Sequence, residues 1–219
     1  ESATWVGIPS GGGTVSVAPG SLTMTMGLSN QKLWTYFAPD GNPAELAVGD
    51  KLRATVEFMA KDMLYNTNSR NFRMGLFHDP TNSQILANVN SDSGGDGNPW
   101  TDATGYALQM PLTSGPSTAN AFQIGKRTGL TTSSLLGSNA AYTFPSPNAS
   151  GGAQVIHQLD NLYTLEFELS YVSASQLDVL ARISDSSGVL SQHQVSDNGT
   201  MLGSSAPYTK FDQIFFRFS

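Results

Sequence analysis

The sequence contains no cysteine, and only 13% of its 219 residues are charged. Without cysteine there are no disulfide bonds and no thiolate metal ligands, so stability depends on packing or on a hard cation bound by oxygen atoms. The histidines His78, His157 and His193 are widely separated, which argues against a zinc site. The formal net charge is -6, and no basic stripe is present to neutralise a phosphate backbone, which argues against nucleic acid as a partner.

Long apolar runs are also missing. No segment approaches the roughly 20 apolar residues that a membrane-spanning helix needs, so no insertion into a membrane is expected. The chain begins at Glu1 with neither an initiator methionine nor a leader that combines a charged and an apolar part. These absences predict a mature protein that is secreted or held at the cell surface, alone or beside other domains of a larger secreted protein.

Sustained helical periodicity is hard to find, whereas alternation of apolar and polar residues recurs along the whole chain. The clearest alternating segment covers residues 163–171 and is followed by another at 177–183, which predicts a hairpin through 172–176. The aromatic segment 211–218 is typical of a buried closing strand. Further strands are predicted at 22–26, 52–58, 72–76, 106–110 and 122–124.

Clusters of turn-forming residues separate the predicted strands. None of them is long enough to be an interdomain linker, so residues 1–219 are predicted to form one all-β domain, a two-sheet antiparallel β-sandwich. The longest irregular segments, 90–105 and 137–152, are candidates for functional loops, and surface decoration is the alternative.

Several segments, in their order along the chain, resemble a known family. They include LAVGDKL at 46–52, FRMGLF at 72–77, GYAL at 105–108 and QIGKRTG at 123–129. This order is similar to that of the concanavalin A-like lectin and glucanase jelly rolls, including laminin-G-like domains, of secreted bacterial proteins. The resemblance implies a jelly roll of two curved antiparallel sheets whose face or rim loops bind glycans, while other relatives cleave glycans or serve as adhesive modules.

Polar side chains between the apolar members of each strand are suited to sugar hydroxyl groups, because carboxylates, amides and guanidinium groups form paired hydrogen bonds. A solvated face with cross-strand ion pairs is the structural alternative. The candidates are Arg53, Glu57, Arg73, Gln109, Gln123, Glu166, Glu168 and Arg182.

Aromatic rings would complete a glycan site, since a flat ring covers the apolar face of a sugar. Trp100 is the first candidate because it follows a polar loop, and Trp34 and Tyr36 are further candidates. Packing of these rings in the core is the alternative.

One loop is rich in oxygen ligands. Asp92, Asp96, Asn98 and Asp102 lie close together in the sequence with glycines among them. Oxygen side chains of this kind suit calcium, which is the one cofactor that the sequence suggests. Their spacing is not that of an EF-hand, and turn formation by the same residues is the alternative.

Cleavage of a glycan is the main rival to simple binding. Hydrolysis needs two carboxylates, and Glu166 and Glu168 lie on one face of a predicted strand, roughly 7 Å apart along it. Their segment lacks the Asp and the final Glu of the Glu-x-Asp-x-x-Glu motif that glucanases of this fold carry. A lyase needs a base, and Gln154, His157 and Tyr208 resemble the motif of jelly-roll alginate lyases, with one extra residue between Gln154 and His157.

These observations favour a secreted, lectin-like module that binds a polysaccharide without cleaving it. Two alternatives stay open at this point. One is a structural or adhesive surface module, for which a surface rich in Ser, Thr and Asn suffices. The other is a glycoside hydrolase or polysaccharide lyase whose catalytic residues come from Glu166, Glu168 and His157.

Overall fold

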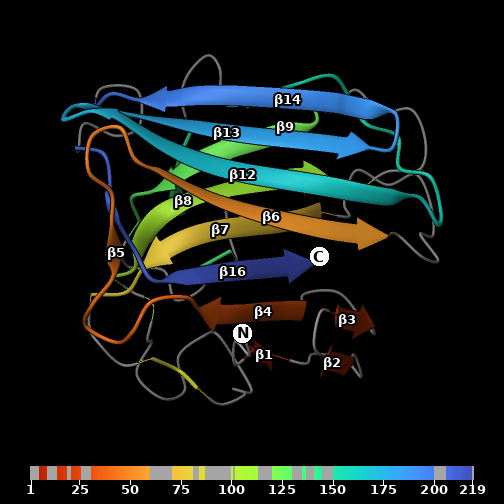
Figure 1. Cartoon of the computed structure of the whole chain (residues 1–219), viewed down its shortest axis with the longest axis horizontal. Coiled ribbons are helices and arrows are strands. Elements are labelled where there is room, and N and C mark those ends of the chain that lie inside the picture. The colour runs from red at the N-terminus through yellow and green to blue at the C-terminus, as the bar shows by residue number, and fades with distance from the viewer. Residues whose placement is uncertain are drawn as a thin grey trace.

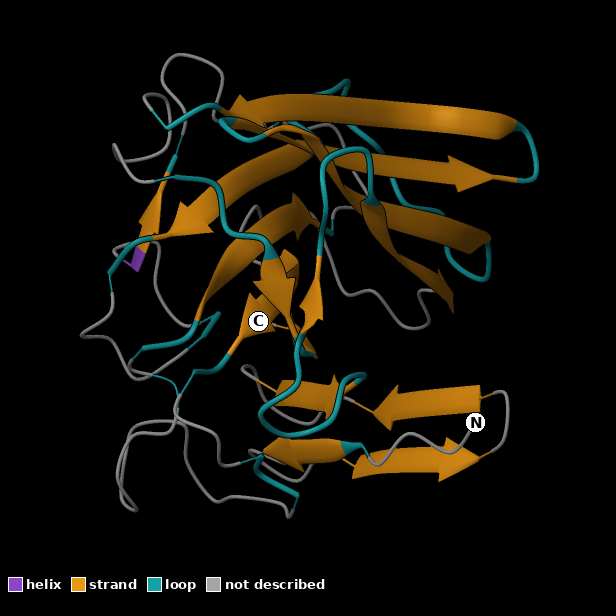
Figure 2. Cartoon of the chain, turned by 60° about the vertical axis from the view of Figure 1, so that its left-hand side comes forward, coloured by secondary structure: helices purple, strands orange, loops and turns teal. Residues whose placement is uncertain are grey.

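Strands and loops make up the described part of the chain apart from one short helical turn at Ala141, which confirms the all-β prediction (Figure 2). The strands form antiparallel sheets, two of them large enough to build a core (Figure 1). The computed structural model describes residues 5–8, 14–18, 21–25, 31–59, 71–80, 84–86, 100, 102–112, 120–129, 135–136, 141–144, 150–199 and 206–218.

The larger sheet, called the large sheet below, has eight strands in the described residues. Its order is β1-β4-β16-β7-β8-β9-β10, and β11 pairs with β9 beside β10. Strands β7 to β10 follow one another in chain order, whereas the closing strand β16 lies between β4 and β7. The bounds are β1 Val6–Ile8, β4 Gln31–Tyr36, β7 Asn71–His78, β8 Thr104–Pro111, β9 Phe122–Arg127, β10 Tyr142–Thr143, β11 Ser150–Gly151 and β16 Gln213–Phe218.

The second sheet, called the small sheet, has four strands in the order β14-β13-β12-β6. Strands β12 and β13 form the predicted hairpin, and only Ala174 and Ser175 separate them. The bounds are β6 Lys51–Met59, β12 Leu162–Ser173, β13 Gln176–Asp185 and β14 Gly188–Asp197. Two short pairs complete the described strands, β2 Thr14–Ala18 with β3 Ser21–Thr25, and β5 Ala44–Glu45 with β15 Lys210–Phe211.

The two sheets share one hydrophobic core, which makes the fold sandwich-like. Strand β12 contributes alternate residues such as Leu165 and Phe167, and β7 and β8 contribute Phe72, Met74 and Leu108 from the opposite side. Alternation produces this arrangement because successive side chains of a strand point to opposite faces. Burial of each large apolar side chain contributes about 1.5 to 3 kcal/mol, so these inward faces provide the main stabilisation of the paired sheets.

The large sheet also has apolar cover on its outer face, the face turned away from the small sheet. Trp34 and Phe215 come from the sheet itself, and Trp100, Leu135 and Leu136 lie over them from the connecting segments. This second cluster covers one end of the outer face. The other end of the same face carries polar and cationic side chains, which are described below.

Candidate functional site

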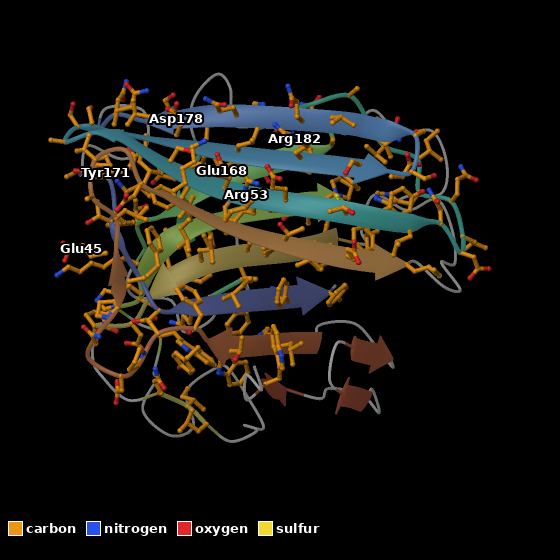
Figure 3. The ribbon with its side chains drawn as sticks, viewed as in Figure 1. Glu45, Arg53, Glu168, Tyr171, Asp178 and Arg182 are labelled. Carbon is orange, nitrogen blue, oxygen red and sulfur yellow. The ribbon has the colours of Figure 1, made fainter. Side chains whose placement is uncertain are left out.

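The outer face of the small sheet carries most of the polar residues that the sequence singles out. Figure 3 shows Arg53, Glu168 and Arg182 on neighbouring strands β6, β12 and β13 of this face. The pairing register sets Glu168 opposite Arg53 and Glu166 opposite Arg182. Alternation predicted that each of these side chains points away from the core, and the pairing of β6, β12 and β13 brings them onto one face.

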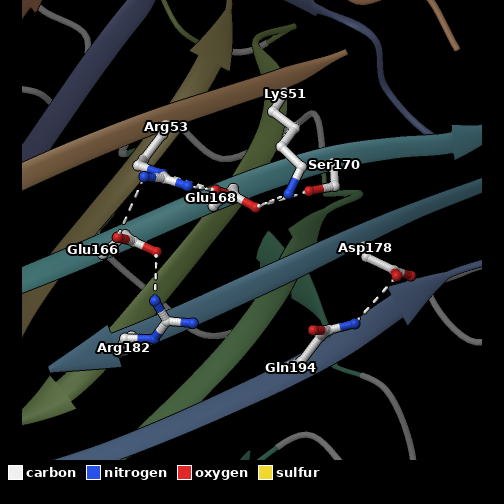
Figure 4. Close-up of polar contacts among 8 residues, drawn as sticks. All are labelled: Lys51, Arg53, Glu166, Glu168, Ser170, Asp178, Arg182 and Gln194. Atoms are coloured by element: carbon white, nitrogen blue, oxygen red, sulfur yellow. Dashed lines mark hydrogen bonds and ion pairs between the residues drawn. The ribbon is translucent and has the colours of Figure 1, made fainter. Parts of the chain in front are cut away.

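These side chains form a continuous chain of ion pairs (Figure 4). Arg182 Nη1 lies 3.4 Å from Glu166 Oε1, and Arg53 Nη1 lies 3.8 Å from Glu166 Oε2. Arg53 Nε also donates to Glu168 Oε2 at 2.7 Å, and Lys51 Nζ donates to Glu168 Oε1 at 2.8 Å. Each carboxylate is thus held between two cations, as in the cross-strand ion pairs expected of a solvated sheet face.

Glu168 is fixed as an ionised carboxylate. Partial burial raises its pKa, but hydrogen bonds from Lys51, Arg53 and Ser170 outweigh burial and hold the pKa at about 2. A general acid must instead carry a proton near the working pH. Its side chain is also only 6% exposed and that of Glu166 only 17%, so the arginines above them limit access by a substrate. The geometry gives this carboxylate pair a structural role.

A second polar group on the same face centres on Asp178. Its carboxylate accepts hydrogen bonds from Gln176 Nε2 at 2.9 Å, Gln194 Nε2 at 3.1 Å and Ser196 Oγ at 2.6 Å. Glu57, at the other edge of the sheet, is exposed opposite Thr164. A ligand that bound to the ion pairs or to the Asp178 group on this face would have to displace hydrogen bonds and ion pairs that are already formed.

His157 does not join Glu166 and Glu168 in one site. Its ring lies in the interior, 5.1 Å from the ring of Tyr163 and 6.1 Å from that of Phe58. Both of these aromatic side chains belong to the inner face of the small sheet, whereas the two glutamates lie on its outer face.

Tyr208, the other residue of the lyase-like motif, is tied to the large sheet. Its hydroxyl group donates to the carbonyl of Arg127 at 2.9 Å, and its backbone N–H donates to Tyr106 Oη at 3.0 Å. The described residues give it a packing role beside β8 and β9.

Trp34 and Trp100 are core residues, so the expectation that they present a ring to a sugar needs correction. Both side chains have no exposed area, and their rings meet edge to face with centroids 5.2 Å apart. Trp34 also stacks on Phe215 at 5.3 Å. Burial of such large rings is strongly favourable, which is why a loop tryptophan closes over the sheet.

Tyr36, the third aromatic candidate, is partly buried at the margin of the same cluster. Its hydroxyl oxygen accepts a hydrogen bond from the backbone N–H of Ile85 at 3.2 Å. Burial raises the pKa of this phenol to about 12, so it stays protonated.

The calcium prediction lies largely outside the described residues. Asp92, Asp96 and Asn98 are among the residues that the structure does not describe, and Asp102 is partly buried near the Arg127 guanidinium group. Within the described residues, no group of three or more acidic or histidine side chains is arranged to hold a metal ion. Calcium binding by this loop stays a prediction.

The outer face of the large sheet holds a straight row of polar residues. The register sets Arg217 of β16 opposite both Lys32 of β4 and Arg73 of β7. Arg73 is in turn opposite Gln109 of β8, which is opposite Gln123 of β9. The sequence named Arg73, Gln109 and Gln123, and only the strand pairing reveals that they are immediate neighbours.

A small hollow lies along this row, beside the edge of the apolar cover. Arg73 Nη1 donates to the carbonyl of Leu136 at 2.8 Å, which anchors the covering segment at the margin of the hollow. At Gly125, a Cβ atom would lie 2.8 Å from the Phe144 ring, so glycine allows this ring to lie on the sheet. We call this feature the sheet hollow; its lining includes Arg73, Gln109, Gln123, Leu136, Tyr142 and Phe144.

The amide of Gln109 is the polar group best placed to meet a ligand in the sheet hollow. Its Nε2 donates a long hydrogen bond of 3.4 Å to Asn71 Oδ1. Its Oε1 atom is buried and accepts no hydrogen bond from any residue that the structure describes. A buried acceptor of this kind is costly unless a donor reaches it, and a ligand hydroxyl group is one such donor.

Tyr142, Phe144 and Arg217 were not among the candidates from sequence. Tyr142 and Phe144 alternate with Thr143, a strand pattern hidden inside the segment 137–152 that was interpreted as irregular. Arg217 stands between Phe216 and Phe218 in the closing strand, where alternation would have turned it outward. The two-residue alternation was present in both places. Turn-forming residues surround Tyr142 and Phe144, and aromatic residues surround Arg217, so the alternation was hard to recognise.

The sequence matches no known protein-family model, and no curated protein shows significant similarity to it. In the part of the chain that the structure describes, no helix could cross a membrane. The geometry of the site therefore carries the functional argument.

Proposed function

We propose that this protein is a secreted, lectin-like module with a concanavalin A-like jelly-roll fold that binds a polysaccharide without cleaving it, and that the sheet hollow is its binding site. One observation carries the proposal. The sheet hollow brings together two aromatic rings, two amides and a guanidinium group, and the amides and the guanidinium group come from neighbouring paired strands. These are the side chains from which sugar sites are built.

The parts of a sugar match the two sides of the hollow. Tyr142 and Phe144 supply an apolar side for the C–H face of a pyranose ring. Gln109, Gln123 and Arg73 supply donors and acceptors for adjacent hydroxyl groups. Because the three polar residues project from paired strands, little side-chain and backbone order has to be gained on binding, which favours affinity.

The fold supports this proposal in a coarser way. Two antiparallel sheets share a core, and the sequence resembles lectin and glucanase jelly rolls over much of its length. Catalysis is not part of the proposal because Glu166 and Glu168 are bound in ion pairs on one face while His157 lies in the interior.

Affinity electrophoresis against a panel of neutral and anionic polysaccharides tests the proposal. We expect retardation by at least one glycan, and no new reducing ends or unsaturated uronate products in the same mixtures. Gln109→Ala and Phe144→Ala should each weaken binding about tenfold, because each removes roughly 1.4 kcal/mol or more of contact free energy.

Gln194→Ala on the outer face of the small sheet is the matched control, and it should leave affinity unchanged. Equal losses for Gln109→Ala and Gln194→Ala would refute the placement of the site. Release of cleavage products would show that the protein is an enzyme and would refute binding without cleavage. Absence of retardation by every glycan would favour a structural or adhesive module.

A further inference from the structure

The accessible surface of the sheet hollow is mainly apolar. Phe144 and Leu136 line it, and the Phe144 ring lies close to the sheet where Gly125 leaves room for it. Tyr142 offers its ring and not its hydroxyl group, because Tyr142 Oη already donates to the carbonyl of Leu135. An apolar part of the ligand is therefore expected to contact these side chains, since burial of its surface is favourable.

The space inside the sheet hollow is small. It exceeds only slightly the volume that one water molecule requires. A whole sugar ring does not fit into such a space, whereas a substituent of a few atoms does. A bound sugar ring would therefore lie over the opening, and one of its substituents would enter.

A buried hydrogen-bond acceptor in the sheet hollow requires a donor. Gln109 Oε1 is buried and accepts no hydrogen bond from any residue that the structure describes. Nε2 of the same amide donates to Asn71 Oδ1 at 3.4 Å, and this contact orients the amide. The substituent that enters should therefore carry an N–H or O–H group for Gln109 Oε1, because an unpaired buried acceptor is costly.

A second amide lies directly across the strand pair. The register sets Gln123 of β9 opposite Gln109 of β8, and opposed side chains have Cβ atoms about 4.5 to 5.5 Å apart. Gln123 is half-buried, and its side-chain amide has no hydrogen-bond partner among the described residues. Since an amide offers both a donor and an acceptor, the two glutamines together suit a ligand group that also donates and accepts.

An acetamido group combines a small apolar part, a donor and an acceptor. We propose that the bound polysaccharide contains an acetamido sugar, and that the sheet hollow receives its acetamido group. The N–H group donates to Gln109 Oε1, and Gln123 Nε2 donates to the carbonyl oxygen. The methyl group packs against Phe144 and Leu136. This inference rests on the proposed function and names its ligand class.

Other common sugar substituents meet these requirements less well. A hydroxyl group supplies a donor and an acceptor but no methyl group for the apolar lining. A free ammonium group supplies donors only, and its charge would lose hydration beside the aromatic rings. The sheet hollow is therefore expected to distinguish an acetylated sugar from its hydroxyl and amino counterparts.

Glycans that share a backbone but differ in one substituent test the inference. Chitohexaose carries acetamido groups where cellohexaose carries hydroxyl groups and the chitosan hexamer carries amino groups. Hyaluronan and heparosan, each compared before and after N-deacetylation, supply two further backbones. Isothermal titration calorimetry should show binding of at least one acetylated glycan, with an affinity at least about tenfold higher than that of its matched counterpart.

Re-acylation tests the size of the space. The deacetylated form of the bound glycan should regain its affinity when its amino groups are acetylated again. Butyrylation should leave the affinity about tenfold lower, because the longer acyl chain exceeds the space in the sheet hollow. Equal recovery with the two acyl groups would contradict entry of the acyl group into the sheet hollow.

Variants test the two glutamines. Gln109→Met keeps the length of the side chain but removes the amide, and it should remove most of the preference for the acetylated glycan. Gln123→Met should reduce this preference. Gln194→Met makes the same change on the outer face of the small sheet and should leave the preference intact. Thermal unfolding of each variant verifies that it is folded.

Two further results would overturn the inference while leaving the proposed function in place. One is binding of glycans without acetamido groups that is as tight as binding of the acetylated ones. The other is an equal loss of preference in Gln109→Met and Gln194→Met. Absence of binding to every glycan would overturn both proposals together.

Discussion

Lys126 and Asp197 form an ion pair with 2.8 Å between Nζ and Oδ2, and neither side chain has any exposed area. Lys126 belongs to β9 of the large sheet and Asp197 ends β14 of the small sheet, so the pair connects the two sheets through the core. Tyr106 Oη adds a hydrogen bond of 2.6 Å to the same carboxylate oxygen, and burial raises the pKa of this phenol. The Asp197 carboxylate therefore joins the two sheets through polar contacts to both Lys126 and Tyr106.

Removing one member of this pair should be severe. Asp197→Ala leaves the Lys126 ammonium group buried without its carboxylate, and we expect a loss of about 3 to 5 kcal/mol in the free energy of unfolding. Urea denaturation followed by circular dichroism measures the loss. Asp178→Ala is the control, because water can replace its partners on the outer face, and it should cost about 1 kcal/mol. Similar losses for the two variants would contradict the structural assignment.

Trp100 should act on stability and not through contact with a ligand. Trp100→Ala removes a fully buried ring that meets Trp34 and Phe215, and we expect a loss of about 3 to 5 kcal/mol in the free energy of unfolding. Trp100→Phe, which keeps part of the ring volume, should cost less. If the free energy of unfolding of Trp100→Ala equalled that of wild type, Trp100 could not be a core residue.

Lys32 should make stability increase with pH in the alkaline range. Its pKa is 10.5 in an ordinary lysine and about 7 in the folded protein, so between these values the unfolded chain binds more protons than the folded chain does. Its contribution to the free energy of unfolding therefore rises from pH 7 towards 10.5, by at most about 1.4 kcal/mol per pH unit.

Urea denaturation at pH 7 and pH 9 checks this expectation. Lys32→Met should be more stable than wild type at pH 7, and its advantage should shrink as pH rises. Lys51→Met, which removes an exposed lysine, should keep the pH dependence of wild type. A pH dependence that persisted unchanged in Lys32→Met would assign the effect to other groups.

Glu168 should stabilise the small sheet at neutral pH and lose this effect in acid. Its folded pKa of about 2 lies below the ordinary value of 4.5, so its stabilisation is complete above about pH 4.5 and is lost as pH falls through 2. Glu168→Gln should lower the free energy of unfolding by about 1 kcal/mol at pH 7. Thermal unfolding should show the two proteins converging near pH 2, and the exposed Glu57→Gln variant should match wild type throughout.

Local sequence pattern was enough to predict the fold class and the orientation of many side chains. Alternation in β12 and β13 placed Phe167 in the core and Glu166 on the surface, and the short interval at residues 172–176 between the two alternating segments predicted the hairpin. This works because the two-residue period of a strand is a property of the backbone, and the contrast between apolar and polar residues decides which face is buried.

What the sequence by itself determined is therefore the all-β class, the main strands and their inward and outward residues. Only the tertiary structure decided that Arg217 lies between Lys32 and Arg73, that Tyr142 and Phe144 meet Gln109, and that Trp100 closes over Trp34. These neighbours come from segments far apart along the chain. Their proximity depends on which strands pair and which loops cover them, and that choice is made by the packing free energy of the whole molecule and not by any local period.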